Sequence, residues 1–226
     1  MSSRPQRGER RADALSKERI VTAAVEILDG EGEAALTFRA LAARLSTGSG
    51  AIYWHVADKH ELLSTATDDV VARALAWVAE DRPPREAVRA IALALYDAIE
   101  AHPWIGAQLS REPWESATLR IFEGFGGQLQ PLGVPERAQF DAASALLNYV
   151  LGLAGQHAAA ARLAARGYPD RASFLSDVAA RWTERDPARF PFAHKVAPHL
   201  REHDDRAQYL AGIDLVLAGI AATAHG

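Results

Sequence analysis

The residues best suited to recognising another molecule lie between Thr37 and Lys59. Arg39 carries a fork of N–H donors that matches the two acceptors on the edge of a guanine base, and Ser49 can both donate and accept a hydrogen bond. The residues around Ser49 are small enough to approach base edges closely, and Ala51 can contact a thymine methyl group. These small residues are Gly48, Gly50 and Ala51. The combination predicts a surface that reads the edges of DNA bases.

Three ring-bearing side chains follow one another at Tyr53, Trp54 and His55. Neighbouring positions on a helix point about 100° apart, so Tyr53 and Trp54 cannot both be buried on one face. We therefore expect at least one of them to contact DNA. The alternatives are that both rings belong to the core, that His55 is a packing residue and that Arg39 is a solvated surface charge.

Two short helices joined by a tight turn would position these side chains. Thr37 is a suitable N-cap for the first helix. The apolar face of that helix is formed by Phe38, Leu41, Ala42 and Leu45. A turn at residues 46–48 interrupts the pattern, and the second helix is predicted over about 49–56. In helix-turn-helix proteins, the second helix of such a pair enters the major groove of DNA.

A longer helix is expected on each side of this pair. Ser16 is a suitable N-cap for the preceding helix, whose apolar residues recur at helical spacing until Gly30 and Gly32 end it. Asp58 caps the following helix, with Glu61 at the capping-box position. The apolar residues of that helix continue well beyond what a three-helix unit needs, so we interpret it as a connector to the rest of the chain.

The remainder of the chain is predicted to form further helices with proline-rich joints between them. They are expected over about 85–101, 103–111, 114–130, 135–166, 170–184 and 204–223. No segment shows sustained alternation of apolar and polar residues, so the predicted fold class is all-α. Residues 186–203 are expected to form an irregular loop with one helical turn.

Composition excludes several classes of protein. The chain has 226 residues and no cysteine, so disulfides and thiolate metal sites are excluded. No run of about 18 apolar residues occurs, and we therefore expect no membrane span. The first residues lack an apolar signal segment, so a cytoplasmic protein is expected.

Charge is unevenly distributed along the chain. The net charge is −4, but residues 1–59 carry nine Lys and Arg against eight Asp and Glu. A locally basic N-terminal unit on an acidic body can contact phosphate at one end. Residues 1–15 are predicted to be a flexible basic arm, which either enters a minor groove or is a plain disordered tail. Its arginines are Arg4, Arg7, Arg10 and Arg11.

The region from about residue 16 to 75 resembles the TetR family of transcriptional repressors. An amphipathic helix, a glycine-containing loop and an arginine are accompanied by the pairs Leu36-Thr37 and Leu41-Ala42. A Tyr-x-His-apolar-x-x-Lys-x-x-Leu signature then begins at Tyr53. The C-terminal half is similar to the tetracycline-responsive members only loosely, through residues 148–152 and 212–219.

The resemblance implies an N-terminal three-helix helix-turn-helix DNA-binding domain, assigned to residues 16–62. A larger helical effector-binding and dimerisation domain is assigned to residues 63–226. In the family, bases are approached by the positions that match Arg39, Ser49, Gly50 and Tyr53. Phosphates lie near the positions that match Thr37, Trp54, His55 and Lys59. The candidate DNA-binding set is completed by Thr47, Gly48 and Ala51.

A single helix-turn-helix unit makes few base contacts, so such proteins form homodimers that bind two half-sites of a palindromic double-stranded operator. The long helices predicted over about 135–166 and 204–223 are the expected interface, as a four-helix bundle around a two-fold axis. The alternative is that these helices form an ordinary monomer core.

A pocket for a small-molecule effector is expected within residues 85–182. Small-molecule sites combine apolar walls with a few polar groups, so the candidates are aromatic and polar residues that interrupt apolar stretches. They are His102, Trp104, Trp114, Phe122, Phe125, Gln128, Asn148, Tyr149, Gln156 and Trp182. For each of them, a plain core or surface position is the alternative.

No metal and no cofactor is predicted. Tetracycline-responsive members of the family bind a magnesium–drug chelate. A loose alignment places Asn148 where those members have a pocket histidine, and Gln156 where they have an acidic residue. Both differences remove ligands suited to a divalent ion.

The sequence therefore predicts a ligand-responsive DNA-binding transcriptional regulator, a repressor that a small-molecule effector releases from its operator. An effector would favour a conformation in which the connector helix, at about 59–79, holds the two recognition helices at the wrong separation. The alternatives are a DNA-binding activator and a non-enzymatic helical protein that binds a partner. An enzyme is not expected, because the chain has no glycine-rich phosphate loop, nucleophile elbow or paired-carboxylate motif.

Overall fold

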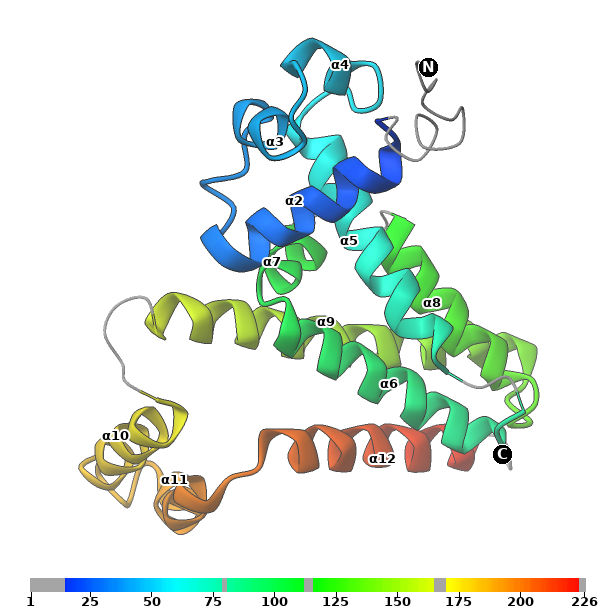
Figure 1. The fold of residues 1–226 in the computed structure, drawn as a ribbon. Coiled ribbons are helices and arrows are strands. Elements are labelled where there is room, and N and C mark those ends of the chain that lie inside the picture. The colour runs from blue at the N-terminus through cyan, green and yellow to red at the C-terminus, as the bar shows by residue number, and fades with distance from the viewer. Residues whose placement is uncertain (1–14, 79–80, 112–115, 165–169, 224–226) are drawn as a thin grey trace, which may run out of the picture.

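The computed structural model describes residues 15–78, 81–111, 116–164 and 170–223. All regular elements within these ranges are helices, which confirms the all-α fold class. The predicted basic arm falls outside the described residues except for its last position, and Trp114 also falls outside them. Figure 1 shows a small group of N-terminal helices above a larger group of long helices.

The N-terminal group contains four described helices. They are α2 (Lys17–Glu31), α3 (Phe38–Arg44), α4 (Ser49–Tyr53) and α5 (Lys59–Ala76). The predicted N-caps of α2, α3 and α5 are confirmed as Ser16, Thr37 and Asp58. The side chain of each accepts a hydrogen bond from the backbone N–H three residues later. Gly32 ends α2 with a φ of +79°, a left-handed conformation that glycine adopts without strain.

The larger group consists of five long or medium helices. They are α6 (Pro84–Ala101), α7 (Trp104–Arg111), α8 (Ser116–Leu129), α9 (Glu136–Ala164) and α12 (Asp205–Thr223). A single cluster of buried apolar side chains extends from Ile20 in α2 to Ile220 in α12. The connector α5 packs against helices of both groups, so the two parts of the molecule share one core.

Helix α7 lies directly on the backbone of α9. A Cβ atom added at Gly106 in α7 would lie 2.2 Å from the carbonyl oxygen of Ala154 in α9. Because no side chain fits at that distance, glycine is required at position 106. The two helices are therefore held in backbone contact.

Ion pairs join α6 to α12. Asp214 in α12 pairs with Arg89 and Arg85 of α6, and Arg206 at the start of α12 lies 3.2 Å from Asp97. The Arg89 guanidinium holds the pKa of Asp214 below its ordinary value, chiefly through a hydrogen bond. The carboxylate is thus charged at neutral pH and ties the two helices together.

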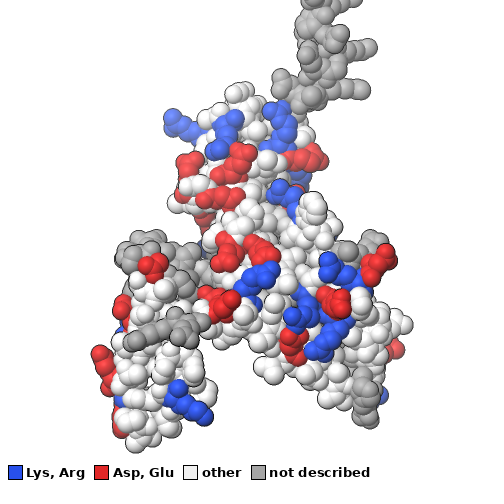
Figure 2. Space-filling model, turned by 60° about the horizontal axis from the view of Figure 1, so that its bottom comes forward, with Lys and Arg blue, Asp and Glu red and all other residues white. Residues whose placement is uncertain are grey.

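Three shorter helices form a separate group, here called the α10 lobe. It comprises α10 (Arg171–Thr183), α11 (Pro191–Val196) and the 3₁₀ helix η1 (Ala197–Glu202). These helices pack on one another, and Figure 1 shows the lobe set apart from the long helices. The space-filling view of Figure 2 shows a hollow between the lobe and the rest of the molecule.

The α10 lobe corrects the sequence analysis. Residues 186–203 were expected to form an irregular loop, but they contain α11 and η1. Pro191 and Pro198 each lie in the first turn of a helix. Proline is favoured there because the first N–H groups of a helix have no intrahelical partner. Pro191 and Pro198 therefore begin helices in a segment that was expected to be irregular.

Candidate nucleic-acid interface

A tight turn separates α3 from α4. Its left-handed residue is Ser46, with a φ of +52°, and the N–H of Thr47 donates to a carbonyl of α3. Gly48 has an extended backbone and is the N-cap of α4. Helix α4 begins at Ser49 as predicted, but it ends at Tyr53, about three residues earlier than expected. The result is one short helix that projects from the N-terminal group (Figure 1).

The side chains at the end of α4 face outward. Trp54 is 90% exposed and Tyr53 is 55% exposed, so neither ring is a core residue. Arg39 on α3 is also exposed and forms no ion pair with any described residue. Arg44 on the same helix instead pairs with Glu26 at 2.9 Å. The guanidinium of Arg39 thus keeps its donors available for an external acceptor.

Two glycines leave the same surface open. Gly48 and Gly50 are exposed, neither has a positive φ, and a Cβ atom added at either would have no atom within 4 Å. Nothing in the described part of the chain therefore requires glycine at these positions. Their small size leaves space for a molecule that approaches α4 from outside.

Tyr53 is supported by a neighbouring aromatic ring. Its ring stacks on that of Phe38, with centroids 4.3 Å apart and planes only 3° from parallel. Phe38 was expected to belong to the buried face of α3, but it is half-buried and lies between the core and the outward-facing tyrosine. The candidate set missed this residue because the stack joins two different helices.

Other predicted DNA-binding residues also make contacts within the chain. The Lys59 ammonium donates to the backbone carbonyl of Glu33 at 2.6 Å, and the Thr37 hydroxyl accepts from the N–H of Ala40. His55 is half-buried. The remaining candidates Thr47, Ser49 and Ala51 are half-buried as well. All eleven candidates nevertheless lie between the N-cap of α3 and the first residue of α5.

Helix α5 begins in a tightly hydrogen-bonded corner beside α4. The Glu61 carboxylate accepts from the N–H of Ala57 at 2.7 Å and pairs with Lys17 of α2 at 3.2 Å. These two contacts lower the pKa of Glu61. We call residues 37–59, which include α3, the turn and α4, the recognition segment. The contacts of Glu61 therefore fix the end of the recognition segment to α2.

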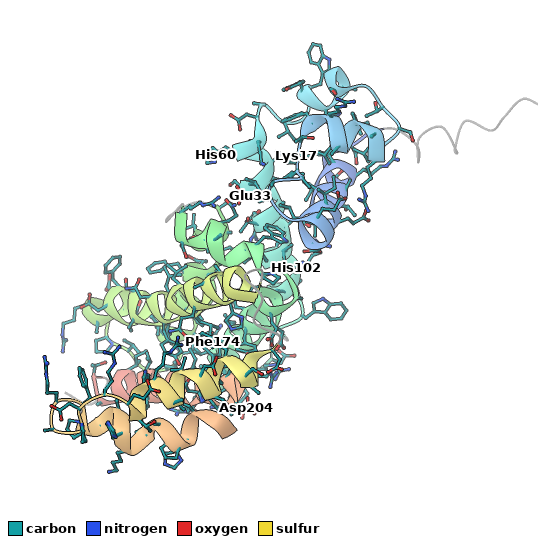
Figure 3. All side chains as sticks on the ribbon, turned by 90° about the vertical axis from the view of Figure 1, so that its left-hand side faces the viewer. Lys17, Glu33, His60, His102, Phe174 and Asp204 are labelled. Atoms are coloured by element: carbon teal, nitrogen blue, oxygen red, sulfur yellow. The ribbon has the colours of Figure 1, made fainter. Side chains whose placement is uncertain are left out.

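Acidic side chains of the N-terminal group contact the larger group (Figure 3). A single carboxylate oxygen of Asp29 lies 2.7 Å from both His102 Nδ1 and Trp104 Nε1. Glu33 accepts from Arg111 at 3.0 Å and from Gln108 at 3.3 Å. We call these contacts the α2–α7 junction. Because α7 lies on the backbone of α9, the junction links the N-terminal helices to the longest helix of the molecule.

The predicted effector-binding residues do not gather at one place. His102 and Trp104 belong to the α2–α7 junction, and Trp182 lies in the α10 lobe. Asn148 and Gln156 are exposed on α9.

The rest of that set lies nearer the interior of the larger group. Phe125 is fully buried in the core, and Phe122 packs edge-on against Phe140. Gln128 is half-buried in α8. Tyr149 stacks on Tyr209 of α12 and donates to its carbonyl at 3.3 Å.

An aromatic cluster that the sequence analysis did not identify surrounds Tyr149. Tyr209 also contacts Tyr96 of α6, whose ring meets His157 of α9 edge-on. Burial raises the pKa of Tyr96 to about 12 and also raises the pKa of Tyr209. The Tyr209 hydroxyl is buried with no hydrogen-bond partner among the described residues. The cluster thus presents a neutral, unpaired donor between α6, α9 and α12.

Within the described residues, no helix is long and apolar enough to span a membrane. Nor do three or more His, Asp or Glu side chains of the described part of the chain come together where they could hold a metal ion. Figure 2 shows Lys and Arg side chains interspersed with Asp and Glu on the surface in view.

Helix α3 with its exposed arginine, the tight turn and the short projecting helix α4 with outward-facing aromatic residues at its end together form a helix-turn-helix. Residues 20–74 match the family described as bacterial regulatory proteins, tetR family. Residues 80–224 match the tetracyclin repressor-like C-terminal domain. The chain belongs to the tetR family of DNA-binding transcriptional regulators, which confirms the resemblance seen in the sequence.

Two curated relatives are similar over part of their length. An HTH-type transcriptional regulator of Saccharopolyspora erythraea is 32% identical over 150 residues, which cover 66% of this chain and 64% of that protein. The HTH-type transcriptional repressor DrrR1 of Streptomyces coeruleorubidus is 34% identical over 157 residues, covering 67% and 56% respectively. The matched part is thus less than two thirds of either relative.

Solved structures match nearly the whole chain. SCO7222, a TetR from Streptomyces coelicolor, is 54% identical with a TM-score of 0.81, covering 93% of this chain and 99% of that one. ActR from S. coelicolor in complex with actinorhodin is 25% identical with a TM-score of 0.74, covering 92% and 96%. Mycobacterium smegmatis BioQ is also similar. BioQ with its double-stranded DNA operator is 26% identical with a TM-score of 0.62, covering 92% and 99%.

Proposed function

We propose that this protein is a dimeric transcriptional repressor that binds a palindromic DNA operator and is released by a small-molecule effector. The observation that carries the proposal is the surface of α3, the turn and α4. There, Arg39, Tyr53 and Trp54 are exposed while two glycines leave room for close approach. Adjacent exposed aromatic rings form a patch of the kind that marks an interaction site, and the helix-turn-helix places this patch beside a DNA groove.

Each candidate residue has a defined place in such a complex. With α4 in the major groove, Ser49 and Gly50 face base edges and Arg39 binds a guanine. The Thr37 hydroxyl already accepts one hydrogen bond, but its proton remains available to a phosphate. Lys59 donates one proton to Glu33 and has two more for the DNA backbone.

The outward faces of α9 and α12 support the homodimer. One face of α12 is an apolar stripe that is buried within the chain; it consists of Tyr209, Ile213, Leu217 and Ile220. The opposite, exposed face of α12 carries Ala211, Leu215, Ala218, Gly219 and Ala222. That of α9 carries Ala145, Asn148, Gly152, Gln156 and Ala159. Faces of small residues allow two helices to pack closely, so we assign the four-helix bundle to them.

Two connections would carry an effector signal to DNA. Helix α5 runs from the recognition segment into the larger group, and the α2–α7 junction forms a second link. The half-sites of an operator lie roughly 34–36 Å apart or a multiple of this, so a shift of a few Å at either link weakens binding. The aromatic cluster around Tyr209 offers apolar walls and a free donor to an effector.

The relatives support this reading. BioQ is known in complex with a DNA operator, ActR with actinorhodin, and DrrR1 bears the name of a repressor. Those properties belong to these proteins. For this chain, residues 16–62 are proposed as the DNA-binding domain and residues 63–226 as the effector-binding and dimerisation domain.

The first test is selective DNA binding. A duplex is enriched from a random-sequence library on the purified protein, and its affinity is compared with that of a scrambled duplex by fluorescence anisotropy at two salt concentrations. We expect selective, salt-dependent binding that Arg39→Ala and Tyr53→Ala weaken at least about tenfold. Arg44→Ala is the matched control, because the Arg44 guanidinium is already paired with acidic side chains.

Equal affinity for both duplexes would contradict the proposal. If DNA binding is selective, the same anisotropy assay becomes a screen for effectors. A small molecule that releases the enriched duplex would support the repressor mechanism. An effector that binds together with DNA without weakening it would exclude that mechanism.

A further inference from the structure

The Phe38–Tyr53 stack joins the two helices of the helix-turn-helix at its outer surface. Phe38 is the first residue of α3, between the N-cap Thr37 and the exposed Arg39. Tyr53 is the last residue of α4. The near-parallel rings are 4.3 Å apart, so one face of the tyrosine ring is covered while the side chain as a whole stays 55% exposed.

The stack on Phe38 restricts the rotamers of Tyr53 already in the protein without DNA. An exposed side chain that binds DNA must lose rotamer freedom, and that loss opposes binding. Trp54, at 90% exposure, has almost no support from the chain. Tyr53 has a flat partner anchored in the core, because Phe38 is half-buried and packs against it.

We infer that Phe38 is a positioning residue for DNA recognition: it holds the Tyr53 ring in the orientation in which that ring contacts the operator. This inference rests on the proposed DNA-binding function. Phe38 itself needs no contact with DNA, and its contribution passes through Tyr53. Removing the flat ring of Phe38 therefore weakens DNA binding only while Tyr53 is present.

A double-mutant cycle tests this directly. Wild type, Phe38→Leu, Tyr53→Ala and the double variant are titrated against the duplex enriched from a random-sequence library. Phe38→Leu should lower the affinity roughly three- to tenfold, the range of one aromatic pair. In the Tyr53→Ala background, the same change should have an effect of less than about twofold.

Thermal melting of the four proteins separates positioning from folding. If Phe38→Leu is unfolded, Phe38→Met provides a second side chain of similar volume without a flat ring. Phe192→Leu is the matched control, because Phe192 is an exposed phenylalanine in α11 of the α10 lobe. Its affinity for the duplex should equal that of wild type.

Two results would overturn the inference while leaving the proposed function intact. One is an equal loss of affinity from Phe38→Leu with and without Tyr53, which would show that Phe38 acts on DNA directly or through the fold. The other is no loss in either background. Failure of the wild-type protein to prefer the enriched duplex over a scrambled one would instead contradict the proposed function itself.

Discussion

Gly50 lies in the first turn of α4, where alanine is the better helix former by up to about 1 kcal/mol. A Cβ atom there would contact nothing within the described chain. We therefore expect Gly50→Ala to leave the free energy of unfolding unchanged or to increase it slightly. In the same protein, operator affinity should fall at least about fivefold, because the new methyl group would meet the DNA.

Gly127→Ala is the matched control for this prediction. Gly127 is an exposed glycine of α8, again with no atom within 4 Å of an added Cβ. Its substitution should stabilise the protein to a similar extent without changing affinity for DNA. Urea denaturation and fluorescence anisotropy measure the two quantities. Unchanged operator affinity in Gly50→Ala would contradict the proposal that Gly48 and Gly50 leave room for DNA.

Single residues also show which features the sequence could predict. The N-caps Ser16, Thr37 and Asp58 were predictable because a cap depends on residues three positions apart. The exposure of at least one aromatic ring followed from helix geometry alone. The stacking of Phe38 on Tyr53 could not be predicted, since it depends on the angle between α3 and α4.

At the scale of elements, the ion pairs between α6 and α12 make stability depend on pH. Arg89 lowers the pKa of Asp214 below its ordinary value of 3.8. A lowered carboxyl pKa stabilises the folded state above that ordinary value and loses its effect as the pH falls through the lowered pKa. Asp214→Asn should therefore reduce the free energy of unfolding at pH 7 by about 0.5 kcal/mol, a small value because solvent screens the pair.

The difference between wild type and Asp214→Asn should remain constant from pH 7 to about pH 5 and shrink below about pH 4. Urea denaturation at a fixed protein concentration measures it. Asp81→Asn is the control, because Asp81 is an exposed carboxylate just before α6 that forms no ion pair within the described residues. A difference that persists at the lowest pH would contradict the assignment to the Asp214 charge.

The helices show where the spacing of apolar residues predicts structure correctly and where it does not. Most helix bounds in the larger group lie within two residues of those predicted, because long amphipathic patterns are a strong local signal. Periodicity alone does not show what each face of α12 packs against: its apolar stripe packs within the chain, and a face rich in small residues lies outside. In the α10 lobe, short helices with initial prolines had no periodic signal to detect.

At the scale of the whole molecule, the outward face of α12 can be tested by its most exposed large residue. Leu215 is 75% exposed in the single chain. In the proposed homodimer it is buried, so Leu215→Glu should place an unpaired charge in the interface and weaken the dimer by at least about 2 kcal/mol. Analytical ultracentrifugation measures the shift towards monomer.

Trp54→Glu is the control for oligomeric state. It adds the same charge to an exposed apolar residue at the opposite end of the molecule, and the dimer should persist. Operator affinity should fall in both variants for different reasons, since Leu215→Glu separates the two recognition helices and Trp54→Glu repels phosphate. A Leu215→Glu protein that stays dimeric would place the interface elsewhere.

The contacts of Glu33 limit how domains can be exchanged between this protein and its relatives. Its backbone carbonyl binds Lys59 beside the recognition segment, while its carboxylate binds Arg111 and Gln108 of α7. Glu33 thus contacts residues of both proposed domains, and the proposed boundary at residues 62–63 falls inside the continuous helix α5. A chimaera that joins the proposed DNA-binding domain to the larger domain of a relative would keep the contact between Glu33 and Lys59. It would lose the contacts of Glu33 with Arg111 and Gln108. To transfer operator preference to a relative, the residues of α7 that bind Glu33 must therefore be transferred together with the DNA-binding domain.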